Sequence, residues 1–157
     1  LEPMGVYSRK HSSFTIVSDG VSIAVPNDPT NESRALDIIA KTGVVTFKES
    51  ALKTPLDIVS NPKNIVFKEL EAAQMPRALD DTDFAVINSN FAMAAKLKPT
   101  KEALVMEDKS SPYVNVLVVK AGNEESAKTK ALIKALQSEK VKAFIDEKYQ
   151  GAVVPAF

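Results

Sequence analysis

Short β-rich runs alternate with helical stretches along most of this chain, and this alternation is the strongest constraint on its fold. The first run, residues 21–25, ends at Pro26, and between residues 32 and 41 the apolar positions repeat with helical spacing. Further strands are predicted at 65–69 and 84–88, each followed by a helix, at 74–80 and 90–96. Because strands and helices alternate, the sequence favours an α/β fold with a largely parallel sheet.

Turn formers and capping residues mark the ends of the first helix. Thr30 or Asn31 can cap its start, and Gly43 can close its end. Residues 110–112, Ser-Ser-Pro, break the chain near its C-terminal third. After this break we expect a fully buried strand at 114–120 and two amphipathic packing helices at 126–137 and 139–149, the second ended by Gly151.

The composition excludes several classes of protein. The chain has 157 residues, of which 45% are hydrophobic and 25% charged, as in ordinary globular domains. Twenty basic and twenty acidic residues balance, so there is no basic surface of the kind that nucleic acids require. Cysteine is absent, which removes disulfides and thiolate chemistry. The longest apolar runs are strand-sized, well short of the roughly 20 residues of a membrane span.

Few residues suggest catalysis or metal binding. His11 is the only histidine, and we interpret it as an exposed loop residue without a partner for general-base work. Asp80, Asp81 and Asp83 lack the spacing of a calcium loop, so we expect a solvated turn. The serines at 12–13 and 110–111 lack the glycines of a nucleophile elbow. We therefore expect no enzyme activity, no metal site and no cofactor.

Five segments, in this order, resemble the NlpA-type family of methionine-binding lipoproteins, which serve ABC importers. They are Val25-Pro-Asn-Asp-Pro-Thr-Asn31 with Arg34, Glu69-Leu-Glu-Ala-Ala-Gln-Met-Pro-Arg-Ala-Leu-Asp80, Ala85-Val-Ile-Asn88, Glu107-Asp-Lys-Ser-Ser-Pro-Tyr-Val-Asn-Val116, and Gly151-Ala-Val-Val-Pro-Ala-Phe157. The resemblance therefore covers essentially the whole chain.

The resemblance implies a fold similar to type II periplasmic binding proteins, in which two α/β lobes are joined by crossing strands and hold the ligand between them. We expect residues 9–113 to form the second lobe, and residues 1–8 with 114–157 to form the crossings and the C-terminal part of the first lobe. The N-terminal part of the first lobe is then missing from this sequence, together with the lipid anchor and an aromatic wall of the pocket. The targeting peptide is expected outside it too, because the chain opens on Leu1.

Three residues are candidates for ligand binding. Arg34 is expected in the first turn of the helix after the Pro26 loop, where a guanidinium can pair with a carboxylate; otherwise it is an exposed arginine paired with Glu32 or Asp37. Asn88 ends a strand, where α/β sheets bind ligands, although an asparagine there can also cap a helix. Asn115 stands in an apolar strand and needs a hydrogen-bond partner. The resemblance implies the ligand-carboxylate role for Arg34.

The resemblance implies an extracytoplasmic protein, lipid-anchored to the membrane, that captures methionine or a related small amino acid and delivers it to the membrane subunits of an ABC importer. Met4, Tyr7 and Phe91 are possible contributors to its apolar pocket, but each also fits a core position. The alternatives are a ligand-sensing effector lobe, an enzyme on the same lobes, and an adhesive surface lipoprotein. We also expect self-association through the apolar residues 114–119.

Overall fold

The computed structural model describes residues 1–157 and divides into two compact units. The larger unit is Met4–Glu107, and the smaller combines Leu1–Pro3 with Asp108–Phe157. The sequence placed these boundaries at residues 9 and 113. Each unit is described separately below.

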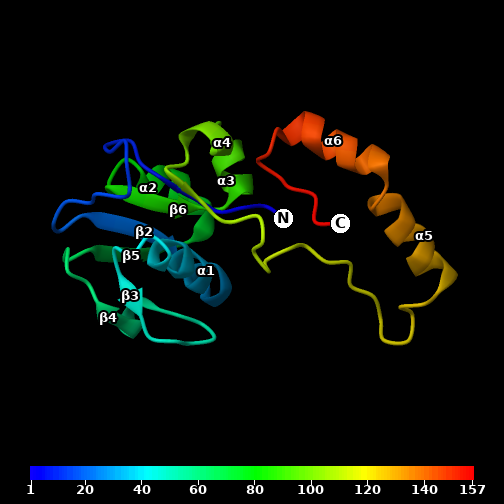
Figure 1. Ribbon diagram of the computed structural model, residues 1–157, viewed down its shortest axis with the longest axis horizontal. Coiled ribbons are helices and arrows are strands. Elements are labelled where there is room, and N and C mark those ends of the chain that lie inside the picture. Colours follow the sequence, from blue (N-terminus) through cyan, green and yellow to red (C-terminus); the bar gives the residue numbers. More distant parts are fainter. The chain divides into compact units, whose positions relative to one another are not determined.

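A five-stranded sheet organises the larger unit (Figure 1). Its strand order is β5-β2-β6-β1-β7, with bounds β5 Val66–Leu70, β2 Ser22–Pro26, β6 Phe84–Ile87, β1 Gly5–Tyr7 and β7 Val105–Met106. Strand β2 runs parallel to both β5 and β6, whereas β1 is antiparallel to β6 and β7. The three strands predicted in this region are confirmed, but the sheet is mixed rather than largely parallel, because two of its four strand pairings are antiparallel. The short strands β1 and β7 were not predicted.

Helices cover both faces of this sheet. Helix α1 (Pro29–Ala40) packs on one face, and α2 (Met75–Ala78) with α3 (Ser89–Ala94) packs on the other. Alternate strand residues serve the two faces: Phe84 and Val86 join the α1 core, whereas Ala85 and Ile87 join the α2 core. Cover on both faces explains why the central strands β2 and β6 are almost entirely apolar and buried, whereas the edge strand β5 carries Lys68 and Glu69.

Smaller elements complete the larger unit. The strands β3 (Thr46–Phe47) and β4 (Ile58–Ser60) form a separate antiparallel pair. A 3₁₀ turn, η1 (Pro55–Asp57), precedes β4, another, η2 (Ala72–Gln74), leads into α2, and α4 (Pro99–Glu102) precedes β7. Met4 and Tyr7 are core residues, at 0% and 1% exposure, and Phe91 packs against the α2 core. The structure therefore favours the core interpretation for all three.

The start of α1 differs from the prediction. Asp28 is the N-cap, its carboxylate accepts a hydrogen bond from the Asn31 backbone N–H at 3.1 Å, and Pro29 occupies the first helical turn. Proline suits that place because its fixed φ matches the helix and its missing N–H costs nothing there. The helix thus begins three residues earlier than predicted, and neither Thr30 nor Asn31 caps it. Gly43, at φ +79°, lies in the turn after the helix.

The smaller unit contains helices α5 (Ala127–Leu136) and α6 (Glu139–Tyr149) and no strand. Both helices were predicted, and both begin after a serine N-cap. Backbone hydrogen bonds between Leu1 and Val154, of 2.8 and 2.9 Å, join the two ends of the chain. No helix in residues 1–157 combines the length and the apolar character that crossing a membrane requires.

The buried strand predicted at 114–120 is wrong. These residues pair with no strand, and Val116 and Val118 are 73% and 81% exposed. A strand is defined by hydrogen bonds to a neighbour, and none of residues 1–157 forms a ladder with this segment. The apolar faces of the two helices are also partly exposed, with Leu132 at 45% and Phe144 at 54%. Their patterns predicted helices correctly but not their burial.

Candidate functional site

Polar side chains gather where β2 and β6 end. The loop after β2 supplies Asp28 and leads directly into α1, whose first turn supplies Asn31 and Glu32; the residue after β6 is Asn88. The backbone N–H of Asn27 donates to the carbonyl of Leu70 at the end of β5, which joins the β2 loop to the neighbouring strand. Ligands of open α/β sheets bind at this carboxyl edge.

Arg34 is buried and forms a two-point ion pair with Glu107. Its Nε donates to Glu107 Oε1 at 2.8 Å and its Nη2 to Oε2 at 2.5 Å, and the two side chains are 10% and 4% exposed. Glu107 Oε2 also accepts a hydrogen bond from the Met4 backbone N–H at 2.9 Å. These bonds fix the plane of the guanidinium, as expected for a two-point pair between arginine and a carboxylate.

Neither structural expectation for Arg34 holds. Arg34 lies in the second turn of α1, because the helix begins at Pro29 rather than near residue 32. It is not an exposed arginine paired with Glu32 or Asp37, since Glu107 is its partner and Asp37 pairs with Lys53 at 2.9 Å. Its role toward a ligand stays a prediction.

Asn88 has an amide that is only half satisfied. Its Nδ2 donates to Asn31 Oδ1 at 2.9 Å, whereas its Oδ1 is buried without a hydrogen-bond partner. Asn88 occupies the N-cap position of α3, yet its side chain makes no capping bond. Because a buried carbonyl oxygen without a donor is costly, this oxygen is suited to receive one from a ligand.

Glu32, in the first turn of α1, carries a buried carboxyl group. Glu32 is 5% exposed, and its Oε1 has no hydrogen-bond partner. Burial, together with the nearby carboxylates of Glu69 and Asp28, raises the pKa of Glu32 from 4.5 to about 7. Glu32 can therefore hold a proton close to neutral pH.

Asn115 belongs to the smaller unit. It is exposed and lies outside any strand, so the expectation that it stands in an apolar strand is wrong. It lines a pocket of about 310 Å³ in that unit, whose other walls are largely apolar: Val116, Leu117, Ile133, Leu136, Gln137 and Phe157. Its role toward a ligand stays a prediction.

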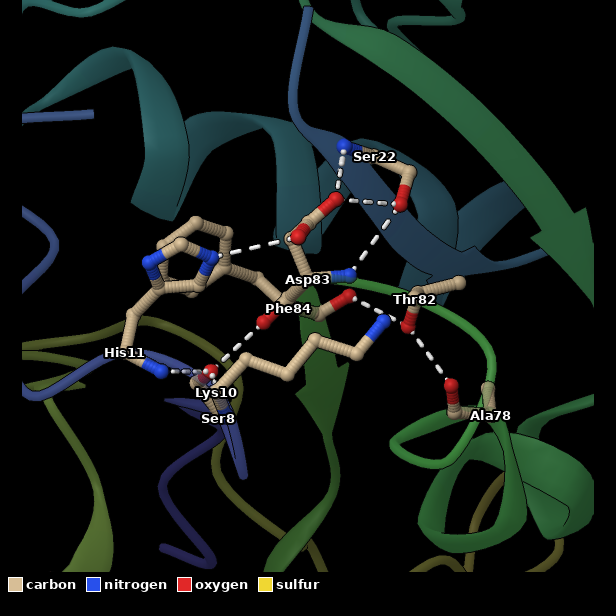
Figure 2. A network of polar contacts seen from close by, with 8 residues as sticks. All are labelled: Ser8, Lys10, His11, Ser22, Ala78, Thr82, Asp83 and Phe84. Carbon is tan, nitrogen blue, oxygen red and sulfur yellow. Dashed lines mark hydrogen bonds and ion pairs between the residues drawn. The ribbon is translucent and has the colours of Figure 1, made fainter. Parts of the chain in front are cut away.

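A second polar network lies at the opposite edge of the sheet, where β2 and β6 begin (Figure 2). Asp83 Oδ2 accepts from the backbone N–H and the hydroxyl of Ser22, at 2.9 and 2.8 Å. Asp83 Oδ1 contacts His11 Nε2 at 3.1 Å, and the His11 ring stacks on Phe84 at 4.8 Å. The bonds from Ser22 and His11 lower the pKa of Asp83 to about 2.

This network corrects two predictions. His11 is not an exposed residue without a partner, because Asp83 and Phe84 hold it in place. Asp83 is bonded to residues of two other segments, so only part of the acidic cluster is a solvated turn. The Asp83 carboxylate lies between Ser22 and His11, so the imidazole does not contact the Ser22 hydroxyl (Figure 2). A serine nucleophile requires that contact, and we therefore interpret the network as structural.

Residues 1–157 contain no group of three or more histidine, aspartate or glutamate side chains that could hold a metal ion. Three residues at the carboxyl edge were not predicted from the sequence: Glu107 as the partner of Arg34, Asn31 as the partner of Asn88, and buried Glu32. Glu107 and Asn31 both lie in the segments that resemble the NlpA-type family, which is the signal that could have identified them.

Comparisons with known proteins agree on one family. The NlpA lipoprotein family matches residues 1–157. The chain is 43% identical to outer membrane lipoprotein 3 of Mannheimia haemolytica over 97% of its length, and 41% identical to the D-methionine-binding lipoprotein MetQ of Escherichia coli K12 over 97%. A solved nutrient-binding protein of Burkholderia cenocepacia, bound to methionine, superposes with a TM-score of 0.93 at 45% identity and covers the whole chain.

The chain is shorter than these proteins. It spans 59% of the Mannheimia lipoprotein, 58% of the E. coli protein and 67% of the Burkholderia chain. The high TM-score shows that the α/β fold described above is that of periplasmic substrate-binding proteins.

Proposed function

This chain is a member of the NlpA lipoprotein family, and from that membership we propose that the complete protein is an extracytoplasmic lipoprotein that captures methionine or a closely related amino acid. It delivers this cargo to the membrane subunits of an ABC importer. It binds its cargo without changing it chemically. The similarity to proteins described as binding methionine supports the choice of cargo.

The observation that carries the proposal is the unpaired amide oxygen of Asn88 at the carboxyl edge of the sheet. An amino acid brings one ammonium group and one carboxylate. Asn88 Oδ1 accepts a hydrogen bond from the ammonium group, while Asn31 holds the other end of the amide. The oxygen that has no partner in the protein thereby gains one from the ligand.

We assign the ligand carboxylate to Arg34. Two of the N–H donors of its guanidinium bond Glu107, which fixes the group before any ligand arrives. Binding therefore does not have to order a long flexible side chain, a cost of about 0.5–1.5 kcal/mol for such a residue. Asn115, in the smaller unit, is the third residue that we assign to the ligand.

The test is calorimetric titration of the intact protein with L-methionine and D-methionine. Asn88→Ala removes the acceptor, and we expect affinity to fall by at least about tenfold, as for a lost hydrogen bond to a charged group. The control is Asn90→Ala, which changes an exposed asparagine two residues further along α3. Its affinity should equal that of the wild type.

Testing Arg34 requires a variant other than Arg34→Ala, because that substitution also removes the ion-pair partner of Glu107. Arg34→Lys keeps the charge but cannot form the two-point pair, so we expect weaker binding of methionine in a folded protein. Arg77→Lys, on the exposed side of α2, is the matched control. Full affinity in both Asn88→Ala and Arg34→Lys would refute the assigned site, and absence of any amino-acid binding by the wild type would refute the function.

We also propose that a protein consisting of residues 1–157 alone self-associates. Its exposed apolar side chains in the smaller unit include Val116 and Val118, and water-exposed apolar surface favours association. Light scattering after size exclusion should give a mass above that of one chain, and Val116→Asp with Val118→Lys should reduce it. A stable monomer at all concentrations would contradict this proposal.

A further inference from the structure

Glu32 occupies a position of α1 that an apolar residue would normally fill. Ala35, Leu36 and Ile39 follow it at spacings of three, four and seven residues, and all three are fully buried against the sheet. Side chains at these spacings share one face of a helix. The Glu32 carboxyl group therefore lies at the end of the core face of α1, between the helix and the sheet.

Glu69 reaches the same place from the sheet. It is in register with Val25 of the adjacent parallel strand, and Val25 packs in the α1 core. Paired residues of neighbouring strands point to the same face, so Glu69 also lies on the α1 side of the sheet. The next residue of that face along β5, Phe67, packs against the same core. Glu32 and Glu69 are thus two carboxyl groups on facing surfaces.

No cation neutralises this pair. Neither glutamate takes part in any ion pair of residues 1–157. Glu69 on β5 and Asp28 at the N-cap of α1 are the charged groups that act on Glu32, and both are acidic. Glu32 is buried, whereas Glu69 is exposed, and a buried carboxyl group that faces acidic neighbours and no cation favours its protonated form. The pKa of Glu32, raised to about 7, agrees with this geometry.

We propose that the buried Glu32 carboxyl holds one proton beside Glu69 and Asp28, and that loss of this proton weakens ligand binding at the carboxyl edge of the sheet. The proposal rests on the proposed function, because the affected ligand group is the carboxylate assigned to Arg34. The pair is a positioning and regulatory device, and neither glutamate has to contact the ligand.

The coupling is electrostatic. Glu32 and Arg34 are two residues apart on one helix, which puts their side chains on the order of 10 Å apart. When the Glu32 proton leaves, a negative charge appears on Glu32, near the place where the ligand carboxylate binds. At that distance, Coulomb repulsion weakens binding by roughly twofold to tenfold for effective dielectric constants between those of water and a protein surface. By linkage, a bound amino acid in turn favours retention of the proton.

The first experiment tests the proton on Glu32 without any ligand. Urea unfolding of the intact protein is followed from about pH 4.5 to about pH 8, together with the Glu32→Gln variant, in which an amide imitates the protonated acid. Because the folded pKa lies above the unfolded one, the folded state holds more protons in this window, and wild-type stability falls as pH rises toward about 7. Glu32→Gln should lose this component, whereas Glu49→Gln, at an exposed site, should follow the wild type.

The second experiment measures methionine affinity by calorimetry from about pH 5.5 to about pH 8, where the amino acid itself keeps both charges. We expect wild-type affinity to fall roughly twofold to tenfold with rising pH, and Glu32→Gln to keep the low-pH affinity throughout. In buffers of different ionisation enthalpy, wild-type binding near pH 7 should show proton uptake that Glu32→Gln lacks.

The outcomes separate this proposal from the proposed function. If Glu32→Gln retains the wild-type pH dependence of both stability and affinity, Glu32 holds no such proton and the proposal is wrong. If the proton appears in the unfolding curves but affinity does not change with pH, the coupling is refuted while the proposed function stands. If the wild type binds no amino acid at any pH, the proposed function fails, and the coupling fails with it.

Discussion

Replacing Glu107 by alanine should be among the most destabilising single changes in this chain. The substitution removes a carboxylate that is 4% exposed and accepts hydrogen bonds from Arg34 Nε, Arg34 Nη2 and the Met4 N–H. It removes the carboxylate that pairs with the buried Arg34 guanidinium. Breaking a buried pair in this way costs about 3–5 kcal/mol, because the remaining charge has lost both water and partner.

Urea unfolding, followed by circular dichroism, measures this cost. With a slope of about 2 kcal/mol per molar urea, which is usual for a small domain, the midpoint should fall by about 2 M. The double variant Arg34→Met with Glu107→Leu removes both charges and should recover most of the loss, since apolar replacement of a buried pair is often neutral or stabilising. Glu125→Ala, which breaks an exposed pair with Lys130, should leave the midpoint nearly unchanged.

The reasoning fails if Glu107→Ala unfolds within about 0.5 M urea of the wild type, a difference of about 1 kcal/mol. It also fails if the double variant is as unstable as the single one. The first result would mean that water or another group replaces the carboxylate at little cost. The second would mean that the shape of the pair, rather than the uncompensated charge, determines the loss.

Three further predictions concern the framework around the site. Asp83→Asn should lower the free energy of unfolding by about 2 kcal/mol at neutral pH, because the pKa of Asp83 is lowered from 3.8 to about 2. In the wild type this stability is present above about pH 4 and disappears as pH falls through about 2. Acid unfolding curves of the two proteins should therefore converge near pH 2. Gly5→Ala should lower the melting temperature, since a Cβ at Gly5 would lie 2.9 Å from the Tyr7 ring, and overpacking of this kind costs about 1–3 kcal/mol; an unchanged melting temperature would show that the ring can move aside. Asp28→Ala removes the α1 N-cap and should cost about 1 kcal/mol in thermal unfolding, with Asp28→Asn largely retaining the cap; equal losses in both variants would argue against a capping role.

Sequence patterns predicted the local structure of the larger unit well. The strand after residue 20, the helix that follows it and the strand that ends before Asn88 all appear where their periodicity places them. Asn88 itself could be placed at the carboxyl edge, because a residue that directly follows a parallel strand lies at the carboxyl end of that strand. The boundaries of α6 agree with its pattern to the residue, since a serine cap and a terminal glycine mark them.

The contacts that build the site could not be predicted in the same way. Arg34 and Glu107 are 73 residues apart, His11 and Asp83 are 72 apart, and nothing in the neighbourhood of either residue indicates its partner. By sequence, Glu32 is an ordinary acidic residue in the first turn of a helix. Only the register of β5 against β2, which pairs Glu69 with Val25, shows that Glu69 lies on the face of the sheet that α1 covers. Its raised pKa is therefore a property of the fold and not of the segment.

The segment at 114–120 also shows the difference between local preference and tertiary pairing. Its sequence alone indicates a strand, because its valines favour an extended chain, yet a strand also needs a neighbour with which to exchange hydrogen bonds. The sequence by itself thus determined which stretches are helical or extended and which family the chain resembles, since caps, periodicity and motifs are local. Only the tertiary structure decided which charges meet and which are buried, because ion pairing and desolvation depend on groups that the folded chain brings together from distant positions.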